Sequence, residues 1–398
     1  QTAHDRNGQN PNAMSKTCAL AAYYFANYHP GDPRNTRLKG ASWSEWQLVR
    51  EARPRFPGHV QPRMPLWGYG DESDPAVMAR KTGAAAAHGV DAFIFDWYYY
   101  DDGPFLEGAL ERGYLGMPDR RPVKFALMWA NHDWTDIHPA RRGVTPALLY
   151  PGAVKPATFR TIADRVIARY FRHPDYWRIG GRPYFSIYDL GKLLASFGGV
   201  AETRAALEEF RARSREAGAG EPHLNAVAWG RPLLPREQAP ADLPALVRDL
   251  GFDSATSYVW VHHVGLPDLA TDYDWVRDRY LDFFADAERR FPVPFHPNVS
   301  VGWDPSPRCH PDSEYAPVGY PFSKTIAGNT PARFGEALAR ICARLRERPE
   351  AGRVVTINSW NEWTEGSYLE PDDINGMGFL EAIARVKGLA PDADGEEV

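Results

Sequence analysis

Residues 354–366 read VVTINSWNEWTEG, and the fold prediction starts from this stretch. Its first four residues, Val354 to Ile357, are all β-branched, which is typical of a strand buried on both faces. The strand continues without a spacer into two carboxylates, Glu362 and Glu365. In parallel α/β folds the C-terminal ends of the strands carry the chemistry. The stretch therefore indicates such a fold, with an acidic pair at its functional edge.

Working outward, the same pattern of a short apolar segment followed by a loop and a helical segment recurs along the chain. We expect the other strands at 19–25, 90–97, 124–129, 183–188, 224–228, 253–258 and 295–301. We expect helices at 75–88, 104–112, 157–170, 201–216, 243–250, 273–290, 332–346 and 376–386. This alternation predicts parallel strands joined by right-handed crossovers, and eight such units predict a (β/α)₈ TIM barrel. Residues 31–70 are too long for a passive connection and are predicted to be an active-site loop or lid.

The predicted domain organisation is one (β/α)₈ catalytic barrel with elaborated βα loops over residues 19–390. Residues 1–18 are interpreted as a disordered leader, added artificially as far as Ala13, with Met14 as the natural start. That interpretation predicts a cytoplasmic protein. The alternative is a secreted protein in which Gln1 is the end left by signal cleavage. Residues 391–398 are predicted to be a frayed acidic tail.

Composition excludes several classes of function. The net charge of −5 and a pI near 6.2 argue against a nucleic-acid partner, which would need clustered Lys and Arg. No apolar run has the eighteen or more residues of a membrane span. The three cysteines contain no C-x-x-C pair, which argues against a zinc ribbon or a disulfide framework and suits a reducing compartment. Oligomeric state cannot be deduced from these features.

No cofactor and no metal are predicted. The chain lacks H-E-x-x-H, G-x-x-x-x-G-K-[ST], G-x-S-x-G and a G-x-G-x-x-G after a strand. The pairs His262-His263 and His132-Asp133 have ligand-type side chains, but neither has a convincing third partner.

The acidic pair suggests glycoside chemistry. Breaking a glycosidic bond uses one carboxyl group to protonate the leaving oxygen and a second as base or nucleophile. On a helical turn Glu362 and Glu365 would lie roughly 5–6 Å apart on one face, and such neighbours hold their pKa values apart. The alternative, that both face water in a turn, is disfavoured by the flanking Trp360 and Trp363. Asp96, Asp189 and Glu45 are rival acids, each of which would serve equally well as an anchor for a loop.

Aromatic and polar residues at the predicted strand ends complete a hypothetical sugar site. Aromatic faces suit the C–H face of a sugar ring, and amide or imidazole groups suit its hydroxyls. The predicted substrate-binding residues are Tyr24, Trp43, Glu45, Trp46, Asp96, Trp97, Trp129, Asn131, His132, Tyr188, Trp229, Tyr258, Trp303 and Asn361. About half of the aromatic residues are expected to be core packing instead.

A set of motifs together resembles the WbsX-type family, which is similar to glycoside hydrolase family 99. The motifs are AYYF at 22–25, WSEW at 43–46, PRFPGH at 54–59, FIFDWY at 93–98, MWAN at 128–131 and WNEWTEG at 360–366. The resemblance runs from about Ala19 to about Leu380, and it implies a distant relative of the family 99 endo-α-mannosidases.

The resemblance also implies roles for the acidic pair. Glu362 would act as base on the sugar's own 2-hydroxyl, giving a 1,2-anhydro intermediate, and Glu365 would act as acid on the leaving group and then as base on water. The motif reads EWTEG where EWHEG is expected in mannan-cleaving relatives, so Thr364 puts mannose specificity in doubt. The main prediction is thus a retaining glycoside hydrolase acting on an α-linked glycan. A glycosyltransferase of O-antigen type biosynthesis and a non-catalytic carbohydrate-binding barrel are the alternatives.

Overall fold

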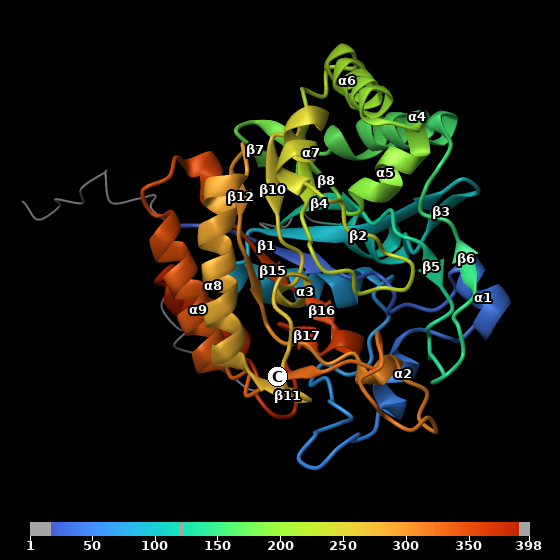
Figure 1. The fold of residues 1–398 in the computed structure, drawn as a ribbon, viewed down its shortest axis with the longest axis vertical. Coiled ribbons are helices and arrows are strands. Elements are labelled where there is room, and N and C mark those ends of the chain that lie inside the picture. Colours follow the sequence, from blue (N-terminus) through green and yellow to red (C-terminus); the bar gives the residue numbers. More distant parts are fainter. Residues whose placement is uncertain (1–16, 119–122, 390–398) are drawn as a thin grey trace, which may run out of the picture.

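The computed structural model describes residues 17–118 and 123–389, and these form a closed parallel barrel (Figure 1). The strands of its sheet are β1 (Ala19–Tyr24), β2 (Ala92–Tyr100), β4 (Lys124–Trp129), β8 (Arg182–Ile187), β9 (His223–Val227), β10 (Ser254–Thr256), β12 (Phe295–His296), β13 (Asn298–Ser300) and β15 (Val354–Asn358). Each pairs in parallel with the next along the chain, and β15 returns to β1 with Ala19 opposite Val354. The (β/α)₈ prediction is confirmed.

The short segments β12 and β13 together form the seventh barrel strand. β12 pairs with β10, β13 pairs with β15, and Pro297 separates them. Proline has no N–H to donate to a ladder, so the strand is interrupted where it changes partners. Counting the two segments as one strand, the nine named strands make the eight of a (β/α)₈ barrel.

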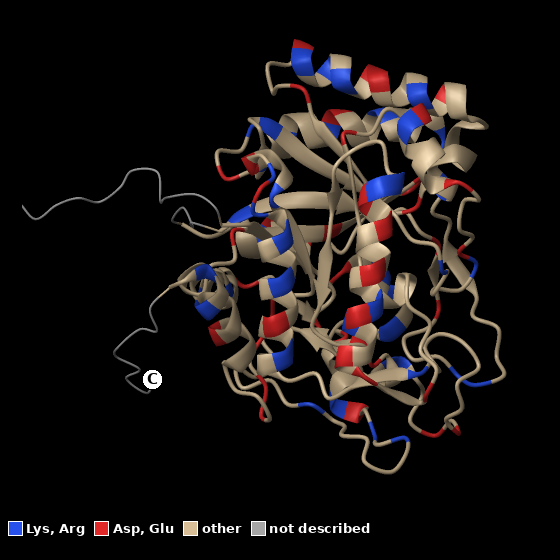
Figure 2. Cartoon of the chain, turned by 60° about the vertical axis from the view of Figure 1, so that its left-hand side comes forward, with Lys and Arg blue, Asp and Glu red and all other residues tan. Residues whose placement is uncertain are grey.

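Helices surround the barrel, and all of them except the one at Leu190–Phe197 lie where the sequence pattern predicts a helix. They are α3 (Pro75–Ala87), α4 (Pro156–Val166), α5 (Leu190–Phe197), α6 (Val200–Glu216), α7 (Leu243–Leu250), α8 (Tyr273–Arg290), α9 (Pro331–Leu345) and α10 (Gly378–Lys387). Several begin with a capping side chain followed by proline: Asp74 accepts from the Ala76 amide before α3, and Thr330 precedes Pro331 of α9. On the outer helices Lys and Arg alternate with Asp and Glu (Figure 2).

One local prediction is wrong in part. The helix expected at 104–112 is replaced by β3 (Gly103–Phe105), which pairs antiparallel with an extended β2, and by a π-helix at Ala109–Tyr114. The aromatic run Tyr98 to Tyr100 therefore continues the strand, as aromatic residues favour. Residues 31–70 also contain regular structure, namely α1 (Pro33–Lys39) and α2 (Trp46–Glu51).

Short elements lie in the connections between the barrel strands and the helices. They are β5 (Trp134–Thr135), β6 (Leu148–Tyr150), β7 (Arg178–Ile179), β11 (Ala270–Asp272), β14 (Thr325–Ala327), β16 (Asn361–Glu362), β17 (Ser367–Tyr368), a π-helix at Ile167–Phe171, and 3₁₀ turns at Trp260–His262, Ser306–Arg308, Glu350–Gly352 and Trp363–Glu365. Among the described residues no helix is both long and apolar enough to cross a membrane. Most of the predicted leader, including Gln1, Ala13 and Met14, and the predicted tail at 391–398 lie outside the described residues.

Candidate active site

The acidic pair sits on a tight hairpin that follows β15. β16 pairs antiparallel with β17, and the 3₁₀ turn Trp363–Glu365 joins them. Gly366 closes the turn with φ of 63°, and a Cβ there would lie 2.7 Å from the Cβ of Asp304, so glycine is required. The Ser359 hydroxyl accepts the Glu362 amide at 2.7 Å and donates to the Ser367 carbonyl at 2.7 Å. Both ends of the hairpin are therefore fixed.

Buried side chains on either side of Glu362 anchor this hairpin. Asn361 bonds both backbone groups of Phe25 at 2.8 Å and also donates to Glu72 at 2.8 Å. Trp363 donates its indole N–H to Glu370 at 2.8 Å. Glu72 and Glu370 are joined by the buried ammonium of Lys81, at 2.5 and 2.6 Å. One buried ion cluster thus holds both neighbours of Glu362.

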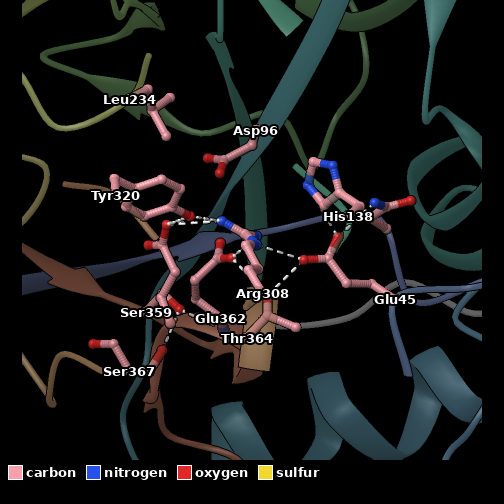
Figure 3. Close-up of polar contacts among 12 residues, drawn as sticks. Glu45, Asp96, His138, Leu234, Arg308, Tyr320, Ser359, Glu362, Thr364 and Ser367 are labelled. Carbon is pink, nitrogen blue, oxygen red and sulfur yellow. Dashed lines mark hydrogen bonds and ion pairs between the residues drawn. The ribbon is translucent and has the colours of Figure 1, made fainter. Parts of the chain in front are cut away.

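Arg308 gathers the carboxylates of the site around one guanidinium (Figure 3). Its Nη2 donates to Glu362 Oε1 at 2.6 Å, its Nη1 to Glu365 Oε1 at 2.8 Å, and its Nε to Glu45 Oε1 at 2.8 Å. The Tyr320 hydroxyl contacts Nη1 and donates to Glu365 Oε1 at 2.6 Å. All three carboxylates are buried. Their hydrogen bonds to the Arg308 guanidinium offset the high free-energy cost of burying their charge.

Glu45 precedes α2 but does not cap it, because its carboxylate points into the site. Oε1 accepts the Thr364 hydroxyl at 2.6 Å, and Oε2 accepts the Asn27 amide at 2.6 Å. Thr364, the residue that departs from the expected EWHEG motif, therefore ties the acidic hairpin to the 31–70 segment. His138 lies 4.0 Å from Glu45 on the other side.

Burial sets the titration of the acids. It raises the pKa of Glu362 well above its ordinary value, against the opposing effect of Arg308, and it raises the pKa of Glu365 in the same way. For Glu45 burial acts upward too, but Arg308, His138 and Thr364 outweigh it and the pKa lies below the ordinary value. Glu45 is thus the carboxylate that stays ionised with Arg308. The other two titrate as a coupled pair that can keep a proton near neutrality.

Seven of the sixteen predicted site residues line one pocket at the C-terminal ends of the strands. They are Asp96, His132, Tyr188, Tyr258, Trp303, Glu362 and Glu365. Burial raises the pKa of Asp96 well above its ordinary value, and this carboxyl accepts the Tyr258 hydroxyl at 3.0 Å while its other oxygen has no partner. Burial lowers the pKa of His132 to about 4, so its imidazole is neutral.

The other nine predicted residues do not line this pocket, which leaves Tyr24, Trp43, Glu45, Trp46, Trp97, Trp129, Asn131, Trp229 and Asn361 as supporting structure. Strand alternation explains three of them. Asp96 and Met128 point into the barrel, so Trp97 and Trp129 point outward and pack on Tyr170 and Phe159 of the helical layer. Tyr24 packs on Phe93 and Phe95 for the same reason.

The remaining supporting residues are held by buried contacts. Trp46 packs on Tyr28 and Trp363, and Trp229 donates its indole N–H to the Tyr188 carbonyl at 3.0 Å. Asn131 bonds both backbone groups of Asp189 at 2.8 Å. Trp43 is buried. These residues shape the rim on which the pocket is built.

Most of the residues that line the pocket were not predicted; among the unpredicted pocket or site residues are Arg308, Tyr320, His138 and Leu234. Arg308 follows a Pro-Ser-Pro stretch in the loop after β13, which predicts a turn but does not mark a functional residue. His138 stacks on Trp134 with ring centroids 4.9 Å apart. In the described part of the chain no group of three or more His, Cys, Asp or Glu is arranged to hold a metal ion.

Solved structures with a similar fold include two glycan-related proteins. The GH99 endo-α-mannosidase from Bacteroides thetaiotaomicron superposes with a TM-score of 0.53 at 15% identity, covering 94% of this chain and 97% of that one. A protein described as glycoside hydrolase-like superposes with a TM-score of 0.57 at 15% identity, covering 94% of each chain. At this identity the similarity establishes the fold.

Sequence comparison identifies closer relatives. Two proteins named WxcX and described as uncharacterized, from two strains of Xanthomonas campestris pv. campestris, are 30% identical over 386 residues, 94% of this chain and 50% of theirs. The chain thus spans about half the length of these curated relatives. The model of the family described as Glycosyltransferase WbsX matches residues 20–383. The chain belongs to this WbsX family.

Proposed function

We propose that this chain is a retaining glycoside hydrolase that cleaves an α-linked glycan with Glu362 and Glu365. The observation that carries the proposal is the position of this pair. Both carboxylates line the pocket at the C-terminal face of the barrel, and both bind the same guanidinium, that of Arg308. In barrels of this kind catalytic residues come from the ends of the strands.

The geometry supports a division of labour within the pair. In the first step Glu362 takes the proton of the sugar's 2-hydroxyl while that oxygen attacks the anomeric carbon. The bond from the anomeric carbon to the leaving oxygen breaks, and Glu365 gives that oxygen its proton. In the second step water attacks the anomeric carbon, and the bond from that carbon to the 2-oxygen breaks. A proton of the water passes to Glu365, and Glu362 returns its proton to the 2-oxygen.

Burial supports both roles. A raised pKa lets Glu365 hold the proton that it must deliver. The pKa of Glu362 is raised further, so Glu362 serves as the base only in the form of the pair in which Glu365 carries the proton. Arg308 is hydrogen-bonded to both carboxyl groups. When one of them takes up a proton, the positive charge of Arg308 is left to stabilise the negative charge of the other. Tyr320, bonded to Glu365, holds that side chain in place.

The name of the family, Glycosyltransferase WbsX, provides a second candidate function, that of a glycosyltransferase. The two candidates differ in the donor: a transferase needs an activated sugar, usually a nucleotide sugar, whereas a hydrolase transfers the glycan to water. A non-catalytic sugar-binding barrel would tolerate the loss of either glutamate.

The test is release of reducing ends from a panel of α-linked glycans, with Glu362→Gln and Glu365→Gln as variants. We expect each variant to lose about 10²–10⁴-fold in rate. Glu381→Gln, an exposed glutamate on α10, is the matched control and should keep full activity. Proton NMR of the first product formed reports retention. Substrates that lack the 2-hydroxyl should be inert. Turnover only with a nucleotide-sugar donor would refute the hydrolase.

A further inference from the structure

The pocket has two chemically different walls. One carries Glu362, Glu365 and Arg308, from the end of β15 and the loop after β13, with Asp96 beside them. The other is aliphatic and is made of Met128, Ala130, Ile137, Leu233, Leu234 and Val259. In the sheet order β9 lies nearly opposite β15, so the β9–α7 loop that carries the two leucines faces the acids across the mouth. In Figure 3 Leu234 lies across the site from Glu362.

Three polar side chains beside the aliphatic wall, those of Tyr188, Tyr258 and Asp133, are already bonded within the protein. The Tyr188 hydroxyl donates to Glu237 at 2.8 Å, and the Tyr258 hydroxyl donates to Asp96 at 3.0 Å. The Asp133 carboxylate accepts from Arg236 and Lys192 at 2.9 and 2.8 Å. A sugar hydroxyl that met this wall would lose its water without gaining an equivalent partner.

A methyl group has the opposite preference, because burial against leucine, isoleucine and valine removes apolar surface from water. Among the groups on a pyranose ring, the substituent at C5 is where methyl and hydroxymethyl alternate naturally, as in 6-deoxyhexoses and hexoses. The other ring positions carry hydroxyls, which suit the charged wall.

We infer, on the basis of the proposed glycosidase function, that the sugar held in this pocket is a 6-deoxyhexose whose C5 methyl packs on Leu233, Leu234 and Val259. One methyl-sized difference in an apolar pocket changes recognition by about 10–200-fold. We therefore expect a preference of at least about 10-fold for a 6-deoxy glycoside over the hexoside that differs only at C6.

The experiment compares matched pairs of methyl α-glycosides: rhamnoside with mannoside, and fucoside with galactoside, in both enantiomeric series. Binding is measured by calorimetry or saturation-transfer NMR on Glu365→Gln, and hydrolysis of the corresponding disaccharides is measured on the wild type. Leu234→Asn should reduce or reverse the C6 preference. Leu148→Asn, an exposed leucine outside the pocket, should leave it unchanged.

The outcomes separate the two proposals. A 6-deoxy preference in binding that Leu234→Asn removes supports the inference, even if no glycan is hydrolysed and the hydrolase proposal fails. Equal or tighter binding of the 6-hydroxy partner overturns the inference while hydrolysis by the glutamate pair stands. If none of the glycosides binds, the inference is overturned, whereas the hydrolase proposal is decided by the release of reducing ends from the glycan panel.

Discussion

Replacing Glu237 with glutamine tests how the aliphatic wall is held in place. Glu237 is buried in the β9–α7 loop and accepts the amides of Leu233 and Leu234 at 2.8 and 2.9 Å. It also accepts the Tyr188 hydroxyl at 2.8 Å. Burial, opposed by these hydrogen bonds and assisted by Asp189, raises the pKa of Glu237 from an ordinary 4.5 to about 7.

The size and sign of the effect follow from that rise. The pKa of Glu237 rises from 4.5 to about 7. At 1.36 kcal/mol for each pKa unit, this rise corresponds to roughly 3 kcal/mol of pH-dependent unfolding free energy. Because the folded pKa is the higher one, the native state binds a proton more tightly than the unfolded chain. The stabilisation is therefore complete below about pH 4.5 and is lost as the pH rises through 7. Glutamine removes this titration and keeps an acceptor for the two amides.

Nearby titratable groups do not mask the effect. Burial lowers the pKa of His262, which lies 3.4 Å from the Tyr188 hydroxyl, to about 3, so it is neutral over the range of the test. Burial raises the pKa of Asp189 to about 6, but this residue is present in both proteins.

The assay is urea unfolding followed by tryptophan fluorescence at intervals from pH 4.5 to 8.5. The wild type should lose roughly 3 kcal/mol of unfolding free energy relative to Glu237→Gln over this range. Glu208→Gln, an exposed glutamate on α6, is the control and should run parallel to the wild type. Parallel curves for Glu237→Gln and the wild type would refute the reasoning.

Three further substitutions test the acidic hairpin. Arg308→Met leaves its carboxylate partners buried and unpaired, so the free energy of unfolding at pH 7 should fall by about 3–5 kcal/mol; a loss below about 1 kcal/mol, as at an exposed ion pair, would contradict this. Lys81→Met should lower the free energy of unfolding, measured in urea, by a similar amount. Because it frees both neighbours of Glu362, it should also lower kcat more than it raises KM. An unchanged kcat would show that the buried ion cluster around Lys81 does not position Glu362. Gly366→Ala places a Cβ 2.7 Å from that of Asp304 at a φ of 63°, so it should destabilise the protein and lower kcat, and wild-type values of both would contradict the required glycine.

The fold was predictable because its signal repeats. Each barrel strand reads as a short apolar run, and each helix is bounded by local caps such as Asp74 before Pro75, so an error in one element does not change the barrel. The region 104–112 shows where this fails. Its helical pattern competes with pairing of Gly103–Phe105 on the extended β2, and only tertiary contacts decide between them.

The site was predictable in part. The acids that end β15 and β2 are visible because they follow buried strands directly. Choosing Trp97 and Trp129 as sugar-binding residues ignored strand alternation, since Asp96 and Met128 already occupy the inward positions. Arg308 could not be singled out among 46 Lys and Arg residues, because its role depends on a loop that brings it beside residues 45, 362 and 365.

The charge balance of the site bears on the choice between hydrolase and transferase. Arg308 is the only cation among the residues that line the pocket, and its donors bind Glu45, Glu362 and Glu365. Burial raises the pKa values of Asp96, Glu362 and Glu365, whereas the pKa of Glu45 lies below its ordinary value, so a single guanidinium faces a site rich in carboxyl groups. Such a pocket repels the diphosphate of a nucleotide sugar and offers it no free donor fork. It favours the positive charge that develops on a sugar ring when a glycosidic bond breaks. The charge balance therefore counts against a nucleotide-sugar donor and is compatible with the neutral glycan substrate that we propose.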